Sequence, residues 1–438
     1  MDFKREKVDC AEVFLENIEK GESYVYSFLK ENQDGIYSNE LNNYARDNLY
    51  VGTAGILHMY VELYQVLKKE KYRKIIDRMT LFLEKHVFDG IETAKTKGEL
   101  VPGMAKAFYT GIAGIGLILN EVYRLNGNIH AQNGAFKVIG YYKNTWTETK
   151  DGIYWTGNSP IFFDGGILLF LIDCYNTYPS EKIQQQCKDL IIKGTDFLLS
   201  HAIEHEDGAM EINQINISFK QKEPNFEFGS AGNGYLFVKV YELTKDVKYL
   251  DAAKSVIKYL KQIAIRQKKG YLIPYKLGRK DHLFYLGNCH GPVGTAKLFY
   301  ALYKVTGQES YLSEVKALAD GAHSLKAPFA QSAGFWNTTC ICCGPAGYVA
   351  FYAGLYHATK DEMWLNLLHK VGEVLVANRT DNHWNIAFDR TKTDEISAPA
   401  GYFTGTAGIV TALLQIYAIE KDLSGFTGLI DDPYTHIS

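Results

Sequence analysis

Two groups of side chains that can bind metals lie directly before glycine turns of this sequence. Cys289 and His290 precede one turn, and Cys342 and Cys343 precede the next turn along the chain. Thiolate and imidazole groups bind soft or borderline cations, and Zn²⁺ is the usual occupant of such sites. If the two turns lie side by side in the fold, three of these side chains can converge. The sequence therefore predicts a zinc site.

The number of ligands decides which kind of zinc site this is. Structural zinc is closed by four protein ligands, whereas catalytic zinc has three and keeps an open position. Cys340 is a possible fourth ligand, but its offset of two residues from Cys342 makes simultaneous binding with Cys343 cramped. We therefore expect an open, catalytic site. The alternative interpretation is that these cysteines are small buried hydrophobic residues, the usual fate of free cysteine.

An internal repeat must position these side chains. A tight Gly-x-x-Gly, followed by an apolar stretch of helical length, occurs seven times, and only the third copy lacks its second glycine. The first glycines are separated by 59, 54, 64, 62, 53 and 61 residues, which is too regular for scattered turns. They are Gly52, Gly111, Gly165, Gly229, Gly291, Gly344 and Gly405. Each period is expected to be one structural unit.

Each unit is expected to contain two helices. An amphipathic helix follows the apolar one, as in residues 245–267, where apolar side chains recur at spacings of three and four. Gly-aromatic segments between units, such as 152–155 and 270–272, are expected to be brief strands or hairpin arms. Seven such pairs predict an all-α fold, an α/α toroid of seven inner and seven outer helices. One domain over 1–438, with an N-terminal helical lead-in over 1–35, is expected; an open solenoid is the alternative.

Composition narrows the class of protein. The 438 residues are 46% hydrophobic and 22% charged, with a net charge of −3, so the chain is globular and has no overall field to attract nucleic acid or anionic lipid. Charges near the N-terminus replace the apolar run of a signal peptide, so a cytoplasmic location is expected. The most apolar stretch, residues 160–174, is interrupted by Asp164 and is too short to span a bilayer.

The cysteine-bearing turns give the sequence a family resemblance. Seven glycine units, with a Cys-x-Gly turn in the fifth and a Cys-Cys-Gly turn in the sixth, resemble the lanthionine synthetase C-like proteins, the cyclases of lanthipeptide biosynthesis. The resemblance covers nearly the whole chain. It implies that Cys289, Cys342 and Cys343 are zinc ligands, in a three-cysteine variant of a site that often has histidine in the last place.

The resemblance also implies a reaction. In the family, a cysteine thiol of a dehydrated precursor peptide takes the fourth zinc position, ionises, and adds to a dehydroalanine or dehydrobutyrine, closing a thioether ring. The chemistry suits the ligands, because coordination to zinc removes the proton of a thiol that is mostly protonated at neutral pH. The expected partners are such a peptide and, in a biosynthetic complex, a dehydratase or a transporter.

The sequence departs from the family at residues for acid–base chemistry. The family commonly has histidine at the position of Phe228, an aromatic residue at that of His290 and arginine at that of Tyr285. It also has an aspartate a few residues before the third turn, whereas Asp164 directly precedes Gly165. The acid that protonates the enolate left by thiol addition has therefore been replaced or lost.

His290 is the first choice for a replacement acid, because it adjoins a zinc ligand and an unperturbed imidazole has a pKa of about 6.5. Asp164 is the second choice. The alternatives are that His290 only hydrogen-bonds the turn backbone and that Asp164 is a helix N-cap. Glu227 is a weaker candidate, expected to be a solvated loop charge. The charged residues Arg279, Asp281 and His282 are expected to be surface groups near the entrance.

Two other functions compete with a cyclase. One is a glycosidase in which a metal-activated cysteine attacks a sugar; it needs a carboxylic acid beside the metal, and no acidic residue lies within five positions of Cys289 or of Cys342 and Cys343. The other is a catalytically silent toroid that binds a peptide or a partner enzyme. The departures at Phe228 and Tyr285 favour it over a conventional cyclase.

Overall fold

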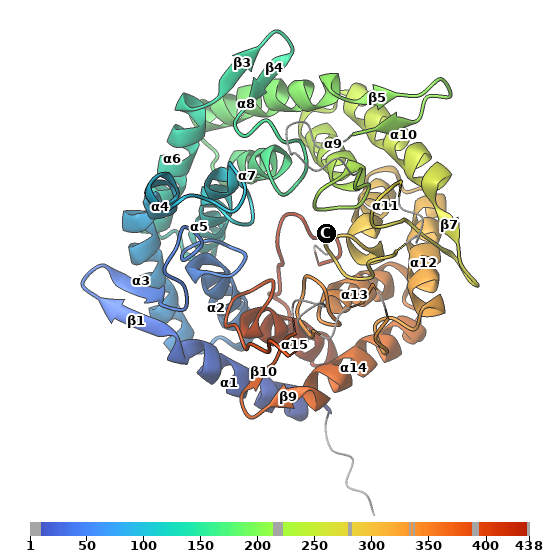
Figure 1. Cartoon of the computed structure of the whole chain (residues 1–438). Helices are drawn as coiled ribbons and strands as arrows, with labels where there is room; N and C mark the ends of the chain where they lie inside the picture. The colour runs from blue at the N-terminus through green and yellow to red at the C-terminus, as the bar shows by residue number, and fades with distance from the viewer. Residues whose placement is uncertain are drawn as a thin grey trace, which may run out of the picture.

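The helices form two concentric rings (Figure 1). The computed structural model describes residues 10–212, 222–278, 283–332, 334–335, 338–387 and 394–435. The inner ring consists of α2 (Thr53–Leu67), α5 (Ile112–Asn126), α7 (Asp164–Thr177), α9 (Ser230–Thr244), α11 (Pro292–Thr306), α13 (Gly347–Thr359) and α15 (Thr406–Glu420). Each inner helix packs on the next, and α15 packs on α2, so the ring is closed. The predicted α/α toroid is confirmed, and the open solenoid is wrong.

The outer ring also has seven helices within the described residues. Six follow their inner partners directly: α3 (Glu70–His86), α6 (Ile129–Asn144), α8 (Glu181–Ser200), α10 (Val247–Ile263), α12 (Glu309–Ser324) and α14 (Glu362–Ala377). The seventh is α1 (Cys10–Ser27), the helix expected in the lead-in, which packs on α15. The N-terminal helix therefore completes the last pair. A short further helix, α4 (Asp89–Lys97), was not expected.

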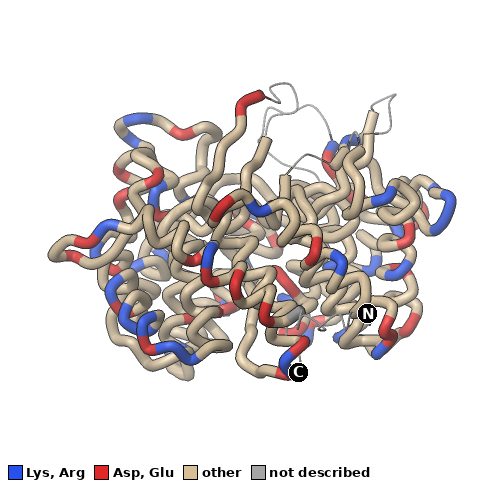
Figure 2. The backbone as a smooth tube through the Cα atoms, turned by 90° about the horizontal axis from the view of Figure 1, so that it is seen from below, with Lys and Arg blue, Asp and Glu red and all other residues tan. Residues whose placement is uncertain are grey.

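Burial separates the two rings. In α5 every residue from Ile112 to Val122 is buried, so this part of the inner helix has no solvent-exposed face. In α10 the buried residues include most of those at the predicted spacing of three and four, such as Tyr249, Val256 and Leu260. Lys254 and Lys258 pair with acidic groups on the surface. Figure 2 shows both signs of charge interspersed over the outer ring.

Within the described residues, five antiparallel hairpins follow outer helices and confirm the expected hairpin arms. They are β1–β2 (Leu29–Asn32, Gly35–Ser38), β3–β4 (Thr147–Thr149, Gly152–Tyr154), β5–β6 (Ile203–Glu204, Met210–Glu211), β7–β8 (Ile265–Arg266, Tyr271–Leu272) and β9–β10 (Arg379–Thr380, His383–Trp384). Each hairpin leads the chain from the outer ring back to the next glycine turn.

The glycine turns are joined by a circle of backbone hydrogen bonds. Each turn donates an N–H to a carbonyl of the neighbouring turn, and the seventh turn donates to the first. The links are Tyr50 to Tyr109 (2.9 Å), Phe108 to Phe162 (3.2 Å), Phe162 to Glu227 (3.0 Å), Glu227 to Cys289 (3.1 Å), Asn288 to Cys342 (2.8 Å), Cys342 to Phe403 (3.0 Å) and Phe403 to Tyr50 (2.8 Å). In six turns this circle places the residues two positions before the first glycine side by side, and Phe162 takes that place in the third turn.

Glycine is needed in these turns because backbone and neighbouring side chains approach closely. A Cβ on Gly294 would lie 1.9 Å from Asn288 O and 2.8 Å from Phe226 Cβ of the preceding turn. Without a side chain, the first turn of each inner helix fits against its neighbour.

The third turn corrects the sequence interpretation. A Cβ on Gly166 would clash with its own turn and with Phe108 Cβ of the preceding turn, as a Cβ on Gly294 would clash with Phe226. Gly166 therefore takes the place of the second glycine in this copy. The position of the first glycine, the N-cap of α7, is held by Phe163. The third copy therefore lacks its first glycine and keeps its second.

The segment after α15 turns into the centre of the ring (Figure 1). The inner helices begin at the glycine turns and finish at the opposite end of the ring. Among the helices described, none combines the length and the apolar composition that crossing a membrane requires.

Candidate metal centre

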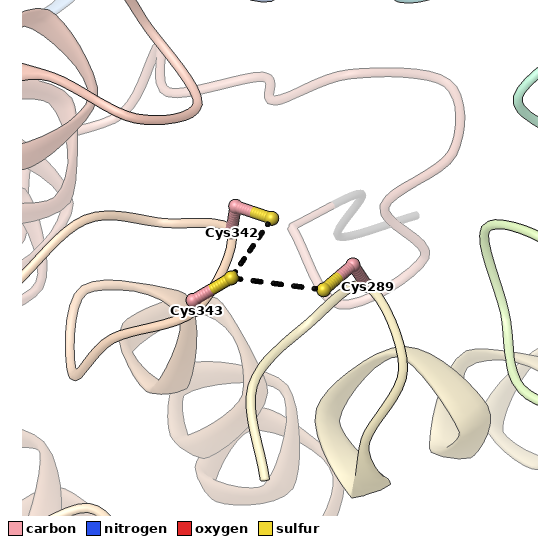
Figure 3. Close-up of side chains that lie close together, drawn as sticks. All are labelled: Cys289, Cys342 and Cys343. Atoms are coloured by element: carbon pink, nitrogen blue, oxygen red, sulfur yellow. Dashed lines mark hydrogen bonds between the residues drawn. The ribbon is translucent and has the colours of Figure 1, made fainter. Parts of the chain in front are cut away.

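Three cysteines from two neighbouring turns converge at the end of the ring where the inner helices begin (Figure 3). Cys289 lies before α11, and Cys342 and Cys343 lie before α13. The Sγ atoms of Cys289 and Cys343 are 3.8 Å apart, those of Cys342 and Cys343 are 3.3 Å apart, and all three lie within 4.8 Å of one another. Their exposed fractions are 5%, 2% and 9%. We call these three residues the cysteine cluster.

The cysteine cluster fits a zinc ion. Zn–S bonds of about 2.3 Å in a tetrahedral site hold sulfur atoms about 3.8 Å apart, so shifts of about 1 Å bring all three thiols to that spacing. The hydrogen bond with Cys289, together with burial, raises the pKa of Cys342 well above its ordinary value. Without a cation the thiols therefore keep their protons. A bound cation would supply the positive charge that three buried thiolates need.

Cys340 lies outside the cluster. It is fully buried, and burial raises the pKa of its thiol, while hydrogen bonds from the Thr338 hydroxyl and from the backbone N–H groups of Cys343 and Cys342 act in the opposite direction. Its sulfur thus faces its own turn. The structure brings three thiols together and leaves the fourth aside, as expected for an open site.

Tyr50 contacts the cluster from the first turn. Its hydroxyl donates to Cys342 Sγ at 3.0 Å, and its ring stacks on Phe403 at 5.1 Å between centroids. A hydrogen bond to a ligand atom fixes that ligand's orientation and reduces its electron donation to a metal. Sequence reasoning missed Tyr50, although it lies two positions before Gly52, as Cys342 lies two before Gly344.

His290 lies in an aromatic enclosure. Its ring stacks on Phe228 at 5.1 Å and meets Tyr275 and Tyr285 edge-on at 4.8 and 5.7 Å. Burial, with a smaller contribution from the charge of Lys276, lowers the pKa of His290 to about 3. The imidazole is therefore neutral at pH 7 and has no readily released proton. Its role as the acid stays a prediction.

Asp164 is held by the loop that precedes α7. Its carboxylate accepts hydrogen bonds from the N–H groups of Trp155 (3.2 Å), Thr156 (2.9 Å) and Gly157 (3.1 Å) and from the Thr156 hydroxyl (2.7 Å). Burial raises its pKa to about 6 despite these bonds. It is the first residue of α7 and not its N-cap. All four bonds go to the loop 155–157, so Asp164 shapes this turn; its catalytic role stays a prediction.

Glu227 is not the solvated charge that the sequence suggested. It is 1% exposed, and its Oε1 has no hydrogen-bond partner among the described residues. Burial raises its pKa to about 8, while Lys297 acts in the opposite direction. Its charge is close enough to affect Cys289 and Cys342. The carboxyl therefore keeps a proton at neutral pH beside the cysteine cluster.

A signal for Glu227 was present in the sequence. It lies two positions before Gly229, the offset of Cys289 from Gly291 and of Cys342 from Gly344. The circle of backbone bonds makes these positions neighbours, since Glu227 N–H donates to Cys289 O. The predicted entrance cluster of Arg279, Asp281 and His282 lies outside the described residues.

The family follows from a comparison of the sequence with family models. The model of the "Lanthionine synthetase C-like protein" matches residues 43–429. The chain belongs to the lanthionine synthetase C-like family. No curated protein sequence matches this chain significantly.

Solved structures share the fold of this lanthionine synthetase C-like protein. Nisin cyclase is 15% identical and superposes with a TM-score of 0.63 over 95% of each chain. An α-mannanase of Bacteroides thetaiotaomicron (13% identity, TM-score 0.48, 93% and 96% of the two chains) and a D-mannose isomerase (14%, 0.48, 94% and 99%) are less similar. At such identities the likeness to nisin cyclase establishes the toroid and leaves the reaction to be argued from the site.

Proposed function

We propose that this protein is a zinc-dependent lanthipeptide cyclase that adds peptide cysteine thiols to dehydroalanine or dehydrobutyrine. The observation that carries the proposal is the cluster of three buried thiols, Cys289, Cys342 and Cys343, in a chain of the lanthionine synthetase C-like family. The substrate is a dehydrated precursor peptide, with a dehydratase or transporter as a further partner, and the reaction takes place in the cytoplasm.

The three cysteines would hold Zn²⁺ as thiolates. When bound, zinc lowers the pKa of a fourth, incoming thiol and makes it a nucleophile at neutral pH. Tyr50 orients Cys342 through the hydrogen bond to its sulfur. The aromatic rings around His290 bury this residue, which directly follows Cys289 in the chain.

Addition of a thiolate to the alkene leaves an enolate that must be protonated at carbon. We propose Glu227 as the proton donor in place of His290 and Asp164. It occupies the position next to Cys289 in the circle of turns, and one of its buried oxygen atoms has no partner among the described residues. Asp164 is occupied by four hydrogen bonds, and the His290 ring is neutral. We assign His290 to the wall of the site and Asp164 to the shape of the third turn.

A Glu227→Gln variant is expected to retain its zinc and to cyclise at least about 100-fold more slowly, because the amide keeps the shape of the side chain and loses the proton. The measurement is the single-turnover rate of ring formation together with the metal content. Glu223→Gln is the matched control: this glutamate is also buried near His290 but pairs with Lys276 at 2.8 Å. If both variants lose the same share of the ring-forming rate, or if Glu227→Gln loses none, Glu227 is not the proton donor.

The function is tested with a peptide that carries one cysteine and one dehydroalanine. After incubation with the protein, the mass of the peptide should be unchanged while its thiol no longer reacts with an alkylating reagent. If every cysteine is still alkylated and zinc is bound, the alternative of a silent, peptide-binding toroid is favoured for that substrate. Release of sugar from an oligosaccharide would instead support the glycosidase.

A further inference from the structure

The chain after α15 forms a loop inside the ring. Residues 427–435, which we call the C-terminal loop, are closed by a hydrogen bond from Thr435 Oγ1 to Thr427 O at 3.2 Å. At the base of the loop, the carboxylate of Glu62 in α2 accepts hydrogen bonds from the N–H groups of Thr427 (3.2 Å) and Gly428 (2.8 Å) and from the Thr427 hydroxyl (2.9 Å). Glu62 is fully buried and lies ten positions after Gly52, about 15 Å down the inner helix.

Other inner helices hold the rest of the loop. Tyr235 of α9 donates its hydroxyl to Ile430 O at 2.6 Å. The hydroxyl of Tyr434 donates to Val293 O of α11 at 2.8 Å, and its ring packs on Tyr300 of α11 and on Phe351 of α13. The loop is therefore bound to α2, α9, α11 and α13, on different sides of the ring (Figure 1).

The tip of the loop contacts a side chain that extends from the glycine turns. Asp431 Oδ2 accepts a hydrogen bond from the hydroxyl of Tyr109, a residue in the circle of turns, at 2.8 Å, and forms an ion pair with Lys297 of α11 at 3.3 Å. Asp431 is 1% exposed and Lys297 is 4% exposed. A buried ion pair needs such closely placed partners, so the tip is fixed in one position.

Little space is left between the loop and the cysteine cluster. A cavity of about 60 Å³ is lined above by Asn288, Ile341 and Phe403, which flank the cluster in the chain, and below by Leu429 and Asp431. It has room for only a few water molecules. A polypeptide does not pass through such a space while the C-terminal loop stays in place.

We propose that the C-terminal loop closes the axis of the ring beneath the cysteine cluster, so that a peptide substrate reaches the cluster only from the glycine-turn end, as a bent segment whose two ends stay outside. This inference rests on the proposed function, because it concerns how the substrate of the cyclase enters. Large precursor peptides are then processed without being threaded, and successive rings form by release and rebinding of short segments.

Blocking the ends of the substrate tests this mode of entry. The probe is a peptide with one cysteine and one dehydroalanine four residues apart, flanked on each side by about 15 flexible residues, roughly 50 Å when extended. Four versions of this peptide are compared: one without a fused domain, one with a small folded domain at the N-terminus, one with it at the C-terminus, and one with it at both ends. We expect ring formation in all four peptides at rates within about twofold. Loss of the reaction when both ends are capped, or when either one is, with the uncapped peptide still cyclised, would overturn the inference.

Hydrogen exchange tests the closure without any substrate. The amides of Thr427 and Gly428 should exchange at least about 1,000-fold more slowly than in a free peptide, whereas the segment around Leu100, which is 82% exposed, should exchange rapidly. Exchange of the two amides at the free-peptide rate would refute a fixed C-terminal loop even if cyclisation is observed. Slow exchange, with no ring formed in the uncapped peptide, would instead count against the proposed function.

Discussion

A Cys343→Ala variant is expected to fold and to lose its bound zinc, from about one ion per chain to nearly none. Two thiols are left, so the proposed three-ligand centre loses one of its protein ligands. Without the metal, a substrate thiol with a pKa of about 8.5 is only about 3% ionised at pH 7, so the ring-forming rate should fall at least about 30-fold from this cause alone. Metal analysis and the alkylation assay measure the two effects.

Cys340→Ala is the control for this variant. It removes a thiol three positions away that is also buried but is turned toward Thr338. Zinc content and rate should both stay close to those of the unmodified protein. Full zinc content in Cys343→Ala, or loss of zinc in Cys340→Ala, would show that the ligand set is wrongly assigned.

The position of the cysteine cluster was predictable because the repeat is regular. Equivalent residues of neighbouring units are brought together by any closed ring, so Cys289 and Cys342, each two positions before a glycine, had to meet. The alternation of apolar and amphipathic helices follows from which side of each helix faces the centre. The seven inner helices and six of the outer helices therefore follow from local pattern and spacing.

Features that depend on distant parts of the chain were not predictable in this way. The seventh outer helix, α1, packs on α15 across nearly the whole sequence, and no local pattern marks that pairing. In the sequence Glu227 resembles a solvated loop charge, but in the fold it is buried, and the charges of Lys297 and of Asp431 in the C-terminal loop act on it. Phe163 in place of a first glycine is recognised only when Gly166 is seen against Phe108. In each case a long-range contact determines the environment of the residue.

The buried pair between Lys297 and Asp431 provides the second large effect, this time on stability. Asp431→Asn leaves the ammonium of Lys297 without its partner carboxylate at the centre of the ring, and the free energy of unfolding should fall by about 3–5 kcal/mol. Lys297→Met combined with Asp431→Asn removes both charges, so the double variant should recover most of that loss. Chemical denaturation of the two single variants and the double variant measures the coupling.

The outer ring offers a control with the same types of partner. Asp196 accepts hydrogen bonds from Tyr249 and Lys248, both at 2.9 Å, as Asp431 does from Tyr109 and Lys297, but it lies at the surface. Because water screens this pair, Asp196→Asn should cost less than about 1 kcal/mol. Similar losses at Asp196 and Asp431, or no recovery in the double variant, would contradict a buried charge pair that fixes the C-terminal loop. If Asp431→Asn lowers the free energy of unfolding strongly and Lys297→Met restores it, the contact that holds the C-terminal loop in the axis also stabilises the ring.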